Sequence, residues 1–240
     1  MQSSIFNLQP SIPAIILAGG LGTRLRGVIN DLPKPMAMIN NKPFLHYVFL
    51  YLTKQRIDKA ILSIGYKAQI IEAYFGDKYL DVEIVYSREE EPLGTGGGIK
   101  KAFALVDDSA FVLNGDTFFD IDLNALKDFH AETKADISLA LKTMQNFDRY
   151  GTVEMKGERI IKFEEKKPVE EGLINGGVYL LNREMLDRVD ADKFSFEKEV
   201  LEKYVSVRQI NGKVFKNYFI DIGIPEDYTK AQLDFIKLFE

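Results

Sequence analysis

Runs of consecutive apolar residues alternate with amphipathic segments along the first half of the chain. Short apolar runs predict buried strands, and apolar residues spaced three and four apart predict helices. The strands predicted in this way are 14–17, 59–63, 82–87 and 110–113, and the predicted helices are 43–54, 68–75, 97–105 and 124–134. Strands and helices that alternate at this spacing predict right-handed βαβ units around a mostly parallel sheet.

The second half of the chain has a less regular pattern, with fewer helices between its strands. The predicted strands are 137–142, 151–155, 159–164, 177–181 and 214–220, and the predicted helices are 196–204 and 225–239. We expect antiparallel pairing among these strands, in a wall over the parallel half. The sequence therefore predicts a single α/β domain over 1–240, with a Rossmann-like, mostly parallel sheet flanked by helices and a smaller antiparallel lobe.

Composition narrows the classes of function. The 240 residues include 31 basic and 36 acidic side chains, and the net charge of −5 argues against a dedicated nucleic-acid surface. The absence of cysteine excludes disulfides, zinc–cysteine sites and thiol catalysis. No apolar run is long enough to span a membrane, and the start of the chain lacks the pattern of a secretory signal. We therefore expect a cytoplasmic protein in which residues 1–12 form a short flexible extension.

The first predicted strand ends in a glycine-rich loop, Leu17-Ala-Gly-Gly-Leu-Gly-Thr-Arg24. Glycines at a strand end let the backbone approach a ligand closely, and their N–H groups form an anion-binding nest. Arg26 and Lys34 add positive charge, which makes phosphate the expected ligand. The loop is neither a Walker A motif, because no lysine follows Gly27, nor a dinucleotide fingerprint, because Leu25 replaces its third glycine. A plain strand-to-helix turn is the alternative interpretation.

A second glycine-rich loop, Pro92-Leu-Gly-Thr-Gly-Gly-Gly98, precedes a predicted helix and follows the acidic run Glu89–Glu91. Its backbone N–H groups could bind a phosphate or the edge of a base. A carboxylate can accept hydrogen bonds from N1–H and the N2 amino group of guanine together, whereas uracil and thymine offer only one such donor. The acidic run therefore favours guanine, and a solvated acidic turn is the alternative.

Six motifs occur in a fixed order between residues 14 and 230. They are the first glycine loop with Pro33-Lys-Pro35, then Pro92-Leu-Gly-Thr-Gly96, Asn114-Gly-Asp116, Phe163-Glu-Glu-Lys166, Asn175-Gly-Gly177 and Asp221-Ile-Gly-Ile-Pro225. In this order they resemble the sugar-1-phosphate nucleotidyltransferases. The residues around them most resemble the D-glycero-D-manno-heptose 1-phosphate guanylyltransferases, with the mannose-1-phosphate guanylyltransferases close behind. Ile224 departs from the pattern, since many relatives have threonine there.

The resemblance implies a GT-A-like nucleotidyltransferase fold and a reaction of a nucleoside triphosphate with a sugar 1-phosphate that releases pyrophosphate. It implies nucleotide binding by residues 14–134 and sugar-phosphate binding by residues 135–240. The implied catalytic residues are Arg24, Lys34, Asp116, Lys166 and Asp221, and Asp116 and Asp221 would hold Mg²⁺. Together with the acidic run, the nucleotide-binding set is Leu17, Ala18, Gly19, Gly20, Gly22, Thr23, Glu89, Glu91, Gly94 and Thr95. The sugar-phosphate set is Glu165, Lys166, Asn175 and Gly176.

The base and the sugar are predicted on different grounds. Thymidylyl-transferring relatives usually carry a glutamine shortly before the second glycine loop, and this chain has none there, which again favours GTP. D-glycero-α-D-manno-heptose 1-phosphate is expected as the acceptor from the resemblance alone. The alternatives are a mannose-1-phosphate guanylyltransferase and a glucose-1-phosphate thymidylyl- or uridylyltransferase.

Two other classes of protein stay open. Asp120-Ile-Asp122 superficially matches the Asp-x-Asp motif of metal-dependent glycosyltransferases, but that class would not explain the first glycine loop. An inactive nucleotide-binding regulatory subunit would need no second metal carboxylate. His46 and His130 match no motif and are expected to be structural, and a homo-oligomer is compatible with the sequence.

Overall fold

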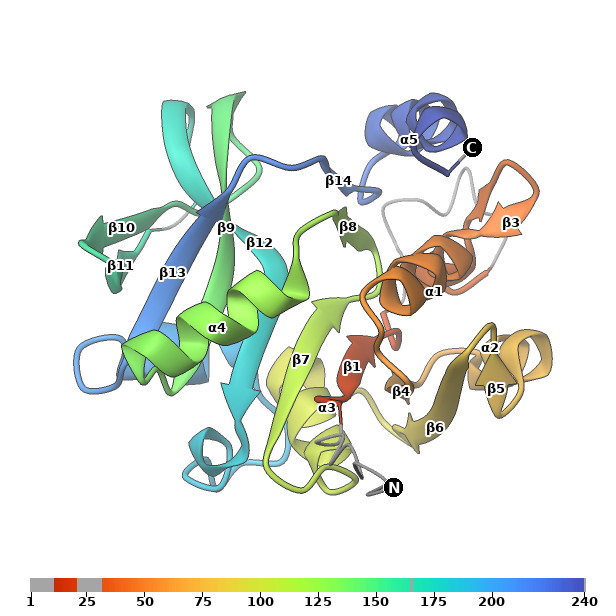
Figure 1. Ribbon diagram of the computed structural model, residues 1–240, viewed down its shortest axis with the longest axis horizontal. Coiled ribbons are helices and arrows are strands. Elements are labelled where there is room, and N and C mark those ends of the chain that lie inside the picture. Colours follow the sequence, from red (N-terminus) through yellow and green to blue (C-terminus); the bar gives the residue numbers. More distant parts are fainter. Residues whose placement is uncertain (1–10, 21–31, 165, 240) are drawn as a thin grey trace, which may run out of the picture.

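The computed structural model describes residues 11–20, 32–164 and 166–239, and its centre is a ten-stranded sheet (Figure 1). From one edge to the other the strands are β10 (Val153–Lys156), β11 (Arg159–Phe163), β13 (Ile210–Phe215), β9 (Ile137–Phe147), β12 (Val169–Asn182), β7 (Ser109–Asn114), β1 (Ala14–Leu17), β4 (Lys59–Ile64), β6 (Val82–Arg88) and β5 (Lys78–Tyr79). Two short pairs lie apart from it: β8 (Thr117–Phe119) with β14 (Phe219–Asp221), and β2 (Met38–Ile39) with β3 (Lys42–Pro43).

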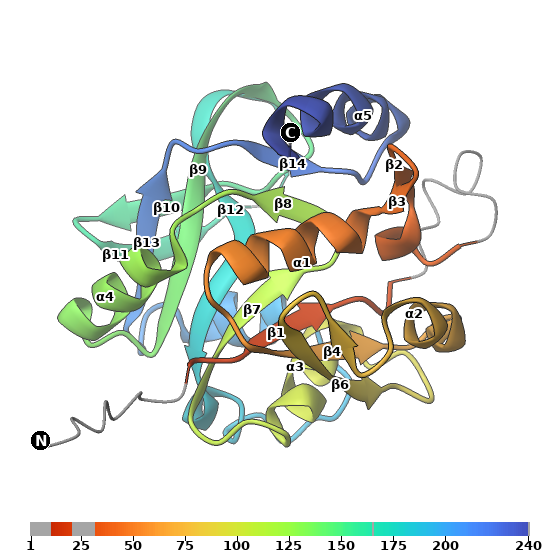
Figure 2. The same cartoon turned by 45° about the vertical axis from the view of Figure 1, so that its right-hand side comes forward.

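Helices cover both faces of the sheet (Figures 1 and 2). They are α1 (Phe44–Lys54), α2 (Ala68–Phe75), α3 (Gly94–Phe103), α4 (Leu123–Thr133) and α5 (Pro225–Phe239), with the short turns η2 (Lys34–Met36), η3 (Arg183–Met185) and η4 (Glu197–Glu202). One apolar core packs the sheet against α1, α2, α4 and α5, and the other packs it against α3 and η4. No helix in the described ranges is long and apolar enough to cross a membrane.

The strands β7, β1, β4 and β6 pair in parallel, as the alternating pattern predicts. β1 lies in their middle, with Ile15 opposite Ile61 on one side and Val112 on the other. Ala14 and Ile16 point into the core under α1, whereas Ile15 points into the core under α3. The unbroken apolar run of β1 is thus explained by burial on both faces.

The antiparallel strands extend this same sheet, instead of forming a separate wall over it as we expected. β12 is antiparallel to both β7 and β9, and β10 and β11 close that edge as a hairpin. β9 and β13 pair in parallel within this part. The predicted α/β class is confirmed, since the parallel half, the helical layers and an antiparallel extension are all present.

Several predicted boundaries are wrong. β9 and β12 run well beyond 137–142 and 177–181, because their polar ends pair with each other away from the core, with Glu171 opposite Gln145. The single strand predicted at 214–220 is two strands, β13 and β14. The chain leaves the main sheet between them, where the Lys142 ammonium donates to the carbonyls of Lys216 and Asn217. The helix predicted at 97–105 begins at Gly94, and the helix predicted at 196–204 contains the π-helical η4.

Candidate active site

The carboxyl ends of β1, β4, β6 and β7 surround a pocket of about 540 Å³, which we call the glycine pocket. Ligands of parallel α/β sheets bind at this edge. Its lining residues are Leu17, Gly19, Gly20, Ser63, Gly65, Tyr66, Glu89, Glu90, Glu91, Pro92, Gly94, Thr95, Asn114, Asp116 and Glu197. All of them except Glu197 belong to the first half of the chain.

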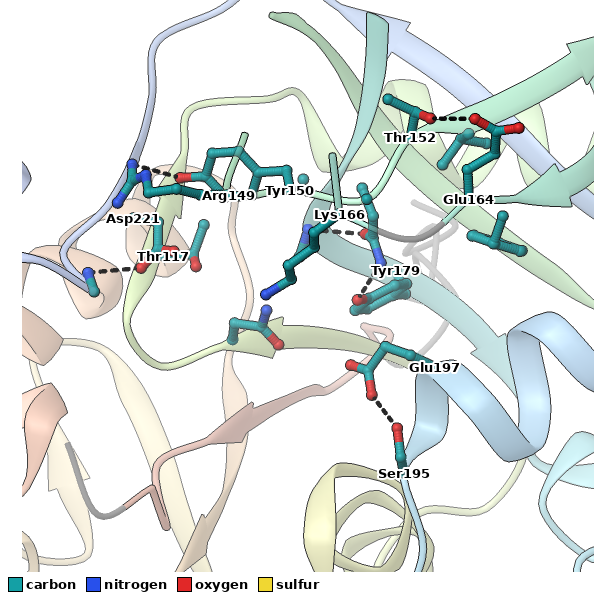
Figure 3. A pocket seen from close by; sticks show the side chains of 18 of the residues that line it. Thr117, Arg149, Tyr150, Thr152, Glu164, Lys166, Tyr179, Ser195, Glu197 and Asp221 are labelled. Carbon is teal, nitrogen blue, oxygen red and sulfur yellow. Dashed lines mark hydrogen bonds between the residues drawn. The ribbon is translucent and has the colours of Figure 1, made fainter. Parts of the chain in front are cut away.

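A second pocket of about 370 Å³, which we call the lysine pocket, is lined mainly by the second half of the chain. Lys166 reaches into its middle, with Arg149 and Asp221 on one side and Glu197 on the other (Figure 3). Asn114 and Glu197 line both pockets, so the two are neighbours separated by a shared wall.

Lys34 joins two carboxylates at the boundary between the pockets. Its ammonium nitrogen lies 2.5 Å from Oδ2 of Asp116 and 3.4 Å from Oδ1 of Asp221. Asp116 lines the glycine pocket and Asp221 lines the lysine pocket. Three segments that are distant in the sequence therefore meet at one charged centre, as the resemblance implies.

The pairing of β8 with β14 produces this meeting. Asp221 is opposite Thr117 in the pair, and the N–H of Ile222 donates to the carbonyl of Asp116 at 3.0 Å. Oδ1 of Asp221 also accepts from the N–H of Gly223 at 2.8 Å. Burial, and then the nearby charge of Asp116, raise the pKa of Asp221 above its usual value. Two close carboxylates in a partly buried place favour a cation between them.

The donor set at this centre fits Mg²⁺, which prefers a few carboxylate oxygens together with phosphate and water. Among the residues that the structure describes, no group of three or more His, Cys, Asp or Glu gathers as a closed metal site. Asp116 and Asp221 would therefore supply part of a coordination shell that a bound phosphate completes. The Lys34 ammonium already shows that a positive charge is accommodated there.

The first glycine loop passes close to the neighbouring chain segments. The N–H of Ala18 donates to the carbonyl of Ser63, and the N–H of Gly115 donates to the carbonyl of Leu17 at 3.0 Å. A Cβ atom on Gly19 would lie 3.3 Å from Oε1 of Glu89, whereas one on Gly20 would meet no atom within 4 Å. Gly20 thus leaves open space on the pocket side. The predicted site residues Gly22, Thr23, Arg24 and Glu165 lie outside the described residues.

The second glycine loop mainly serves packing. The N–H groups of Gly96 and Gly97 both donate to the carbonyl of Phe194, so these two are not free for the phosphate or base edge that we expected the loop to bind. A Cβ atom on Gly96 would lie 2.1 Å from the Phe194 ring, and one on Gly97 would lie 2.2 Å from the carbonyl oxygen of Asp192. The glycines are needed because residues 192–196 lie directly against α3. Gly94 and Thr95 remain on the pocket wall.

Glu89 connects two segments of the wall of the glycine pocket through hydrogen bonds. Its Oε1 accepts from the Ser63 hydroxyl at 3.0 Å and its Oε2 accepts from the N–H of Leu93 at 2.9 Å. A Cβ atom on Gly98 would lie 2.8 Å from the same Oε1. Glu91, in contrast, lines the pocket with an exposed side chain. The two predicted base-reading carboxylates therefore have different surroundings.

Arg149 and Lys166 bring positive charge to the lysine pocket. The guanidinium of Arg149 pairs with Asp227 of α5 at 2.5 Å and lies 5.3 Å from the centre of the Tyr150 ring. On another wall, hydrogen bonds from Lys162 and Lys167 lower the pKa of Glu164 to about 2. The carboxylate of Glu164 is consequently paired with cations.

Asn175 lines the lysine pocket, but its amide is already engaged. It donates to the hydroxyl of the buried Tyr179 at 2.8 Å and accepts from the N–H of Gly177 at 3.1 Å. Gly177 has φ +71, and a Cβ atom there would lie 2.6 Å from the side-chain amide of Asn114. A Cβ atom on Gly176 would lie 2.5 Å from the ring of Phe119. This motif therefore also shapes the wall between the pockets.

The residues outside the predicted site have structural partners. Asp122 caps α4 by accepting from the N–H groups of residues 124 and 125, and Asp120 lies 3.7 Å from Lys54, so the Asp-x-Asp pair has no place in either pocket. His46 lies 2.9 Å from the hydroxyl of Tyr79. His130 lies between the Ser138 hydroxyl and the Asn182 side chain.

Sequence reasoning missed Arg149 and Glu197. Arg149 stands in Asp148-Arg-Tyr-Gly151, where a basic residue beside an aromatic residue and a glycine was a signal before the strand β10. Glu197 stands in Phe194-Ser-Phe-Glu-Lys-Glu199, which contributed to the resemblance without an assigned role. Neither could be placed in a pocket without the tertiary structure.

Comparison with known proteins gives consistent matches. Residues 13–237 match the family described as Nucleotidyl transferase. The chain is 54% identical over 221 residues to the D-glycero-alpha-D-manno-heptose 1-phosphate guanylyltransferase of Aneurinibacillus thermoaerophilus, covering 91% of this chain and 96% of that protein. It is 52% identical over 217 residues to the protein of the same name from Campylobacter jejuni subsp. jejuni, covering 90% and 96%.

A solved structure agrees over nearly the whole length. The crystal structure of HddC from Yersinia pseudotuberculosis complexed with GMP-PN superposes with a TM-score of 0.84 and 38% sequence identity, covering 94% of this chain and 100% of that chain.

Proposed function

The chain belongs to the nucleotidyl transferase family, and on this premise we infer that it transfers the guanylyl group of GTP to D-glycero-α-D-manno-heptose 1-phosphate. The products are a GDP-sugar and pyrophosphate. The structural observation that carries this inference is the meeting of two pockets at Lys34, Asp116 and Asp221. A transfer between two bound phosphorylated substrates needs such a shared charged boundary.

We propose that the glycine pocket takes the nucleotide and the lysine pocket takes the sugar phosphate. The lining of each pocket supports the division of the chain into halves at 14–134 and 135–240, because only Glu197 in the first pocket and Asn114 and Thr117 in the second cross it. Glu91 would then accept from the guanine edge, while Glu89 connects Ser63 at the end of β4 to Leu93 in the second glycine loop.

In the proposed reaction an oxygen of the sugar phosphate attacks the α-phosphorus of GTP. A new P–O bond forms as the bond to the bridging oxygen breaks, and its electron pair leaves on pyrophosphate. The nucleophile is already an anion, so the chain needs no general base and instead positions the groups and neutralises charge. Arg149 and Lys166 would hold the attacking phosphate, and Lys34 would stabilise charge on the phosphates of GTP.

We propose that Asp116 and Asp221 hold Mg²⁺ together with phosphate oxygens. The bound ion supplies positive charge that stabilises the triphosphate. Lys34 stays next to these carboxylates and would share that task. We also keep the cytoplasm as the proposed location.

A pyrophosphate-release assay tests the function. GTP, ATP, UTP and dTTP are each combined with the 1-phosphates of the heptose, mannose and glucose. We expect GTP with the heptose 1-phosphate to give the highest kcat/KM. Faster turnover with UTP or dTTP would overturn the guanine assignment, and faster turnover with mannose 1-phosphate would overturn the sugar. No turnover with any pair would favour an inactive subunit.

A further inference from the structure

Glu197 occupies the wall between the two pockets and lines both of them. Its Oε2 accepts a hydrogen bond from the Thr95 hydroxyl at 2.7 Å and a second one from the Ser195 hydroxyl at 2.8 Å. Figure 3 shows the bond from Ser195. Thr95 in turn accepts from the N–H of Phe196 at 2.9 Å. These bonds fix the orientation of the carboxylate and involve only one of its oxygens. The proposed reaction assigns no role to this carboxylate.

The helix that contains Glu197 forms part of the wall of the lysine pocket. Glu197, Lys198 and Glu202 all line that pocket, and Ser195 precedes them on the same wall. Residues five apart would point in different directions in an α-helix of 3.6 residues per turn. The i→i+5 pattern of the π-helical η4 brings Glu197 and Glu202 to the same side. Of this group only Glu197 also reaches the glycine pocket.

Arg149 and Lys166 in the lysine pocket are suited to a phosphate. Glu197 lies on the other side of Lys166 from Arg149 (Figure 3). A carboxylate repels phosphate and accepts hydrogen bonds from hydroxyl groups. A sugar 1-phosphate bound with its phosphate at Arg149 and Lys166 would present its hydroxyl groups to Glu197.

We propose that Glu197 determines sugar specificity by accepting a hydrogen bond from one hydroxyl group of the bound sugar through Oε1. Thr95 and Ser195 hold the other oxygen, so the acceptor is oriented before the sugar binds. This inference rests on the proposed function, because it needs a sugar 1-phosphate in the lysine pocket. Glu202 extends the same wall without a fixed partner of this kind among the described residues.

The test combines Glu197→Gln with a set of substrates that each lack one hydroxyl. The initial rate with GTP is measured for the heptose 1-phosphate and for its monodeoxy analogues. With the parent sugar, E197Q should lose about 10- to 100-fold in kcat/KM, the range for a lost hydrogen bond to a charged group, mainly through KM for the sugar phosphate. With one analogue the two proteins should differ by less than about twofold, because the contact is already absent.

Glu199→Gln is the matched control. Glu199 stands on the same helix, lies 3.7 Å from Lys203 and lines neither pocket, so E199Q removes the same charge outside the site. For every analogue, E199Q should keep the wild-type ratio of kcat/KM between the parent sugar and the analogue. If E197Q unfolds, as judged by its melting temperature, E197D replaces it. Because the shorter side chain moves the acceptor away from the sugar, E197D should lose kcat/KM with the parent sugar and with every analogue except the one that lacks the contacted hydroxyl.

Three results would overturn the inference. The first is an equal loss in the Glu197 variant with the parent sugar and every monodeoxy analogue. The second is a loss that disappears with 2′-deoxy- or 3′-deoxy-GTP, because Glu197 would then bind the ribose. The third is an E199Q loss equal to that of E197Q. If the wild-type protein turned over no sugar 1-phosphate with GTP, the proposed function would itself have failed, and this inference with it.

Discussion

Gly97→Ala should destabilise the protein, although this exchange normally stabilises a helix. Gly97 lies inside α3, where alanine is favoured over glycine by about 1 kcal/mol. The position faces the segment before η4, and a Cβ atom there would lie 2.2 Å from the carbonyl oxygen of Asp192 and 2.7 Å from Cβ of Leu93. That segment cannot retreat freely, because the carbonyl of Phe194 accepts from the N–H groups of Gly96 and Gly97.

Whether G97A destabilises the protein depends on the cost of the clash compared with the gain in helix propensity. Overpacking a core costs about 1–3 kcal/mol, and a clash with backbone belongs at the upper end of that range. After subtraction of the helix gain, we expect a net loss of about 1–2 kcal/mol. For a chain of this size such a loss lowers the melting temperature by about 2–8 °C.

Thermal unfolding followed by circular dichroism measures the effect, and Gly20→Ala is the control. A Cβ atom on Gly20 would meet no atom within 4 Å, but Gly20 lines the glycine pocket. G20A should therefore keep the melting temperature and raise KM for GTP. If G97A melted at or above the wild-type temperature and raised KM for GTP instead, the second glycine loop would serve the nucleotide and our packing argument would be wrong.

Three further predictions concern the site. Asp221→Asn should fold normally and lose about 10²- to 10³-fold in kcat, as for other groups that stabilise charge in a transition state, and near wild-type turnover would exclude its role. Lys34→Ala should lower kcat with every sugar, whereas Lys166→Ala should raise KM for the sugar phosphate and leave GTP affinity intact. Equal losses of GTP affinity by calorimetry would contradict this split. Glu91→Gln should reduce the preference for GTP over ATP, while Glu89→Gln should lower the melting temperature, because only Glu89 holds both Ser63 and Leu93. If E89Q changed the base preference and E91Q lowered the melting temperature, the two assignments would have to be exchanged.

The parallel half of the fold could be predicted from the sequence because burial on both faces produces unbroken apolar runs. The strand 14–17 and the helix 68–75 are found with the predicted bounds. The long ends of β9 and β12 could not be predicted, since their exposed residues show no apolar run. Antiparallel strands with solvated ends carry little of the signal on which such predictions depend.

The candidate site was predictable only in part, for a related reason. The motifs identified Lys34, Asp116 and Asp221 through resemblance, but their meeting depends on the three-residue strands β8 and β14, which have no periodic pattern. The place of Glu197 could not be predicted from the sequence either, because the π-helical winding of η4 decides which of its residues reach the pocket.

The sheet explains why the proposed reaction centre lies between the two pockets. β12 joins the parallel half to the rest of the sheet, so each half of the chain can form its own pocket on one rigid frame. Two of the contacts between the halves lie at the pockets: the β8–β14 pair, which brings Asp221 beside Asp116, and the bond from Thr95 to Glu197. Backbone pairing thus fixes Asp221 beside Asp116, and two hydroxyl groups fix Glu197. A rigid placement of this kind is what a transfer that relies on positioning and charge neutralisation requires.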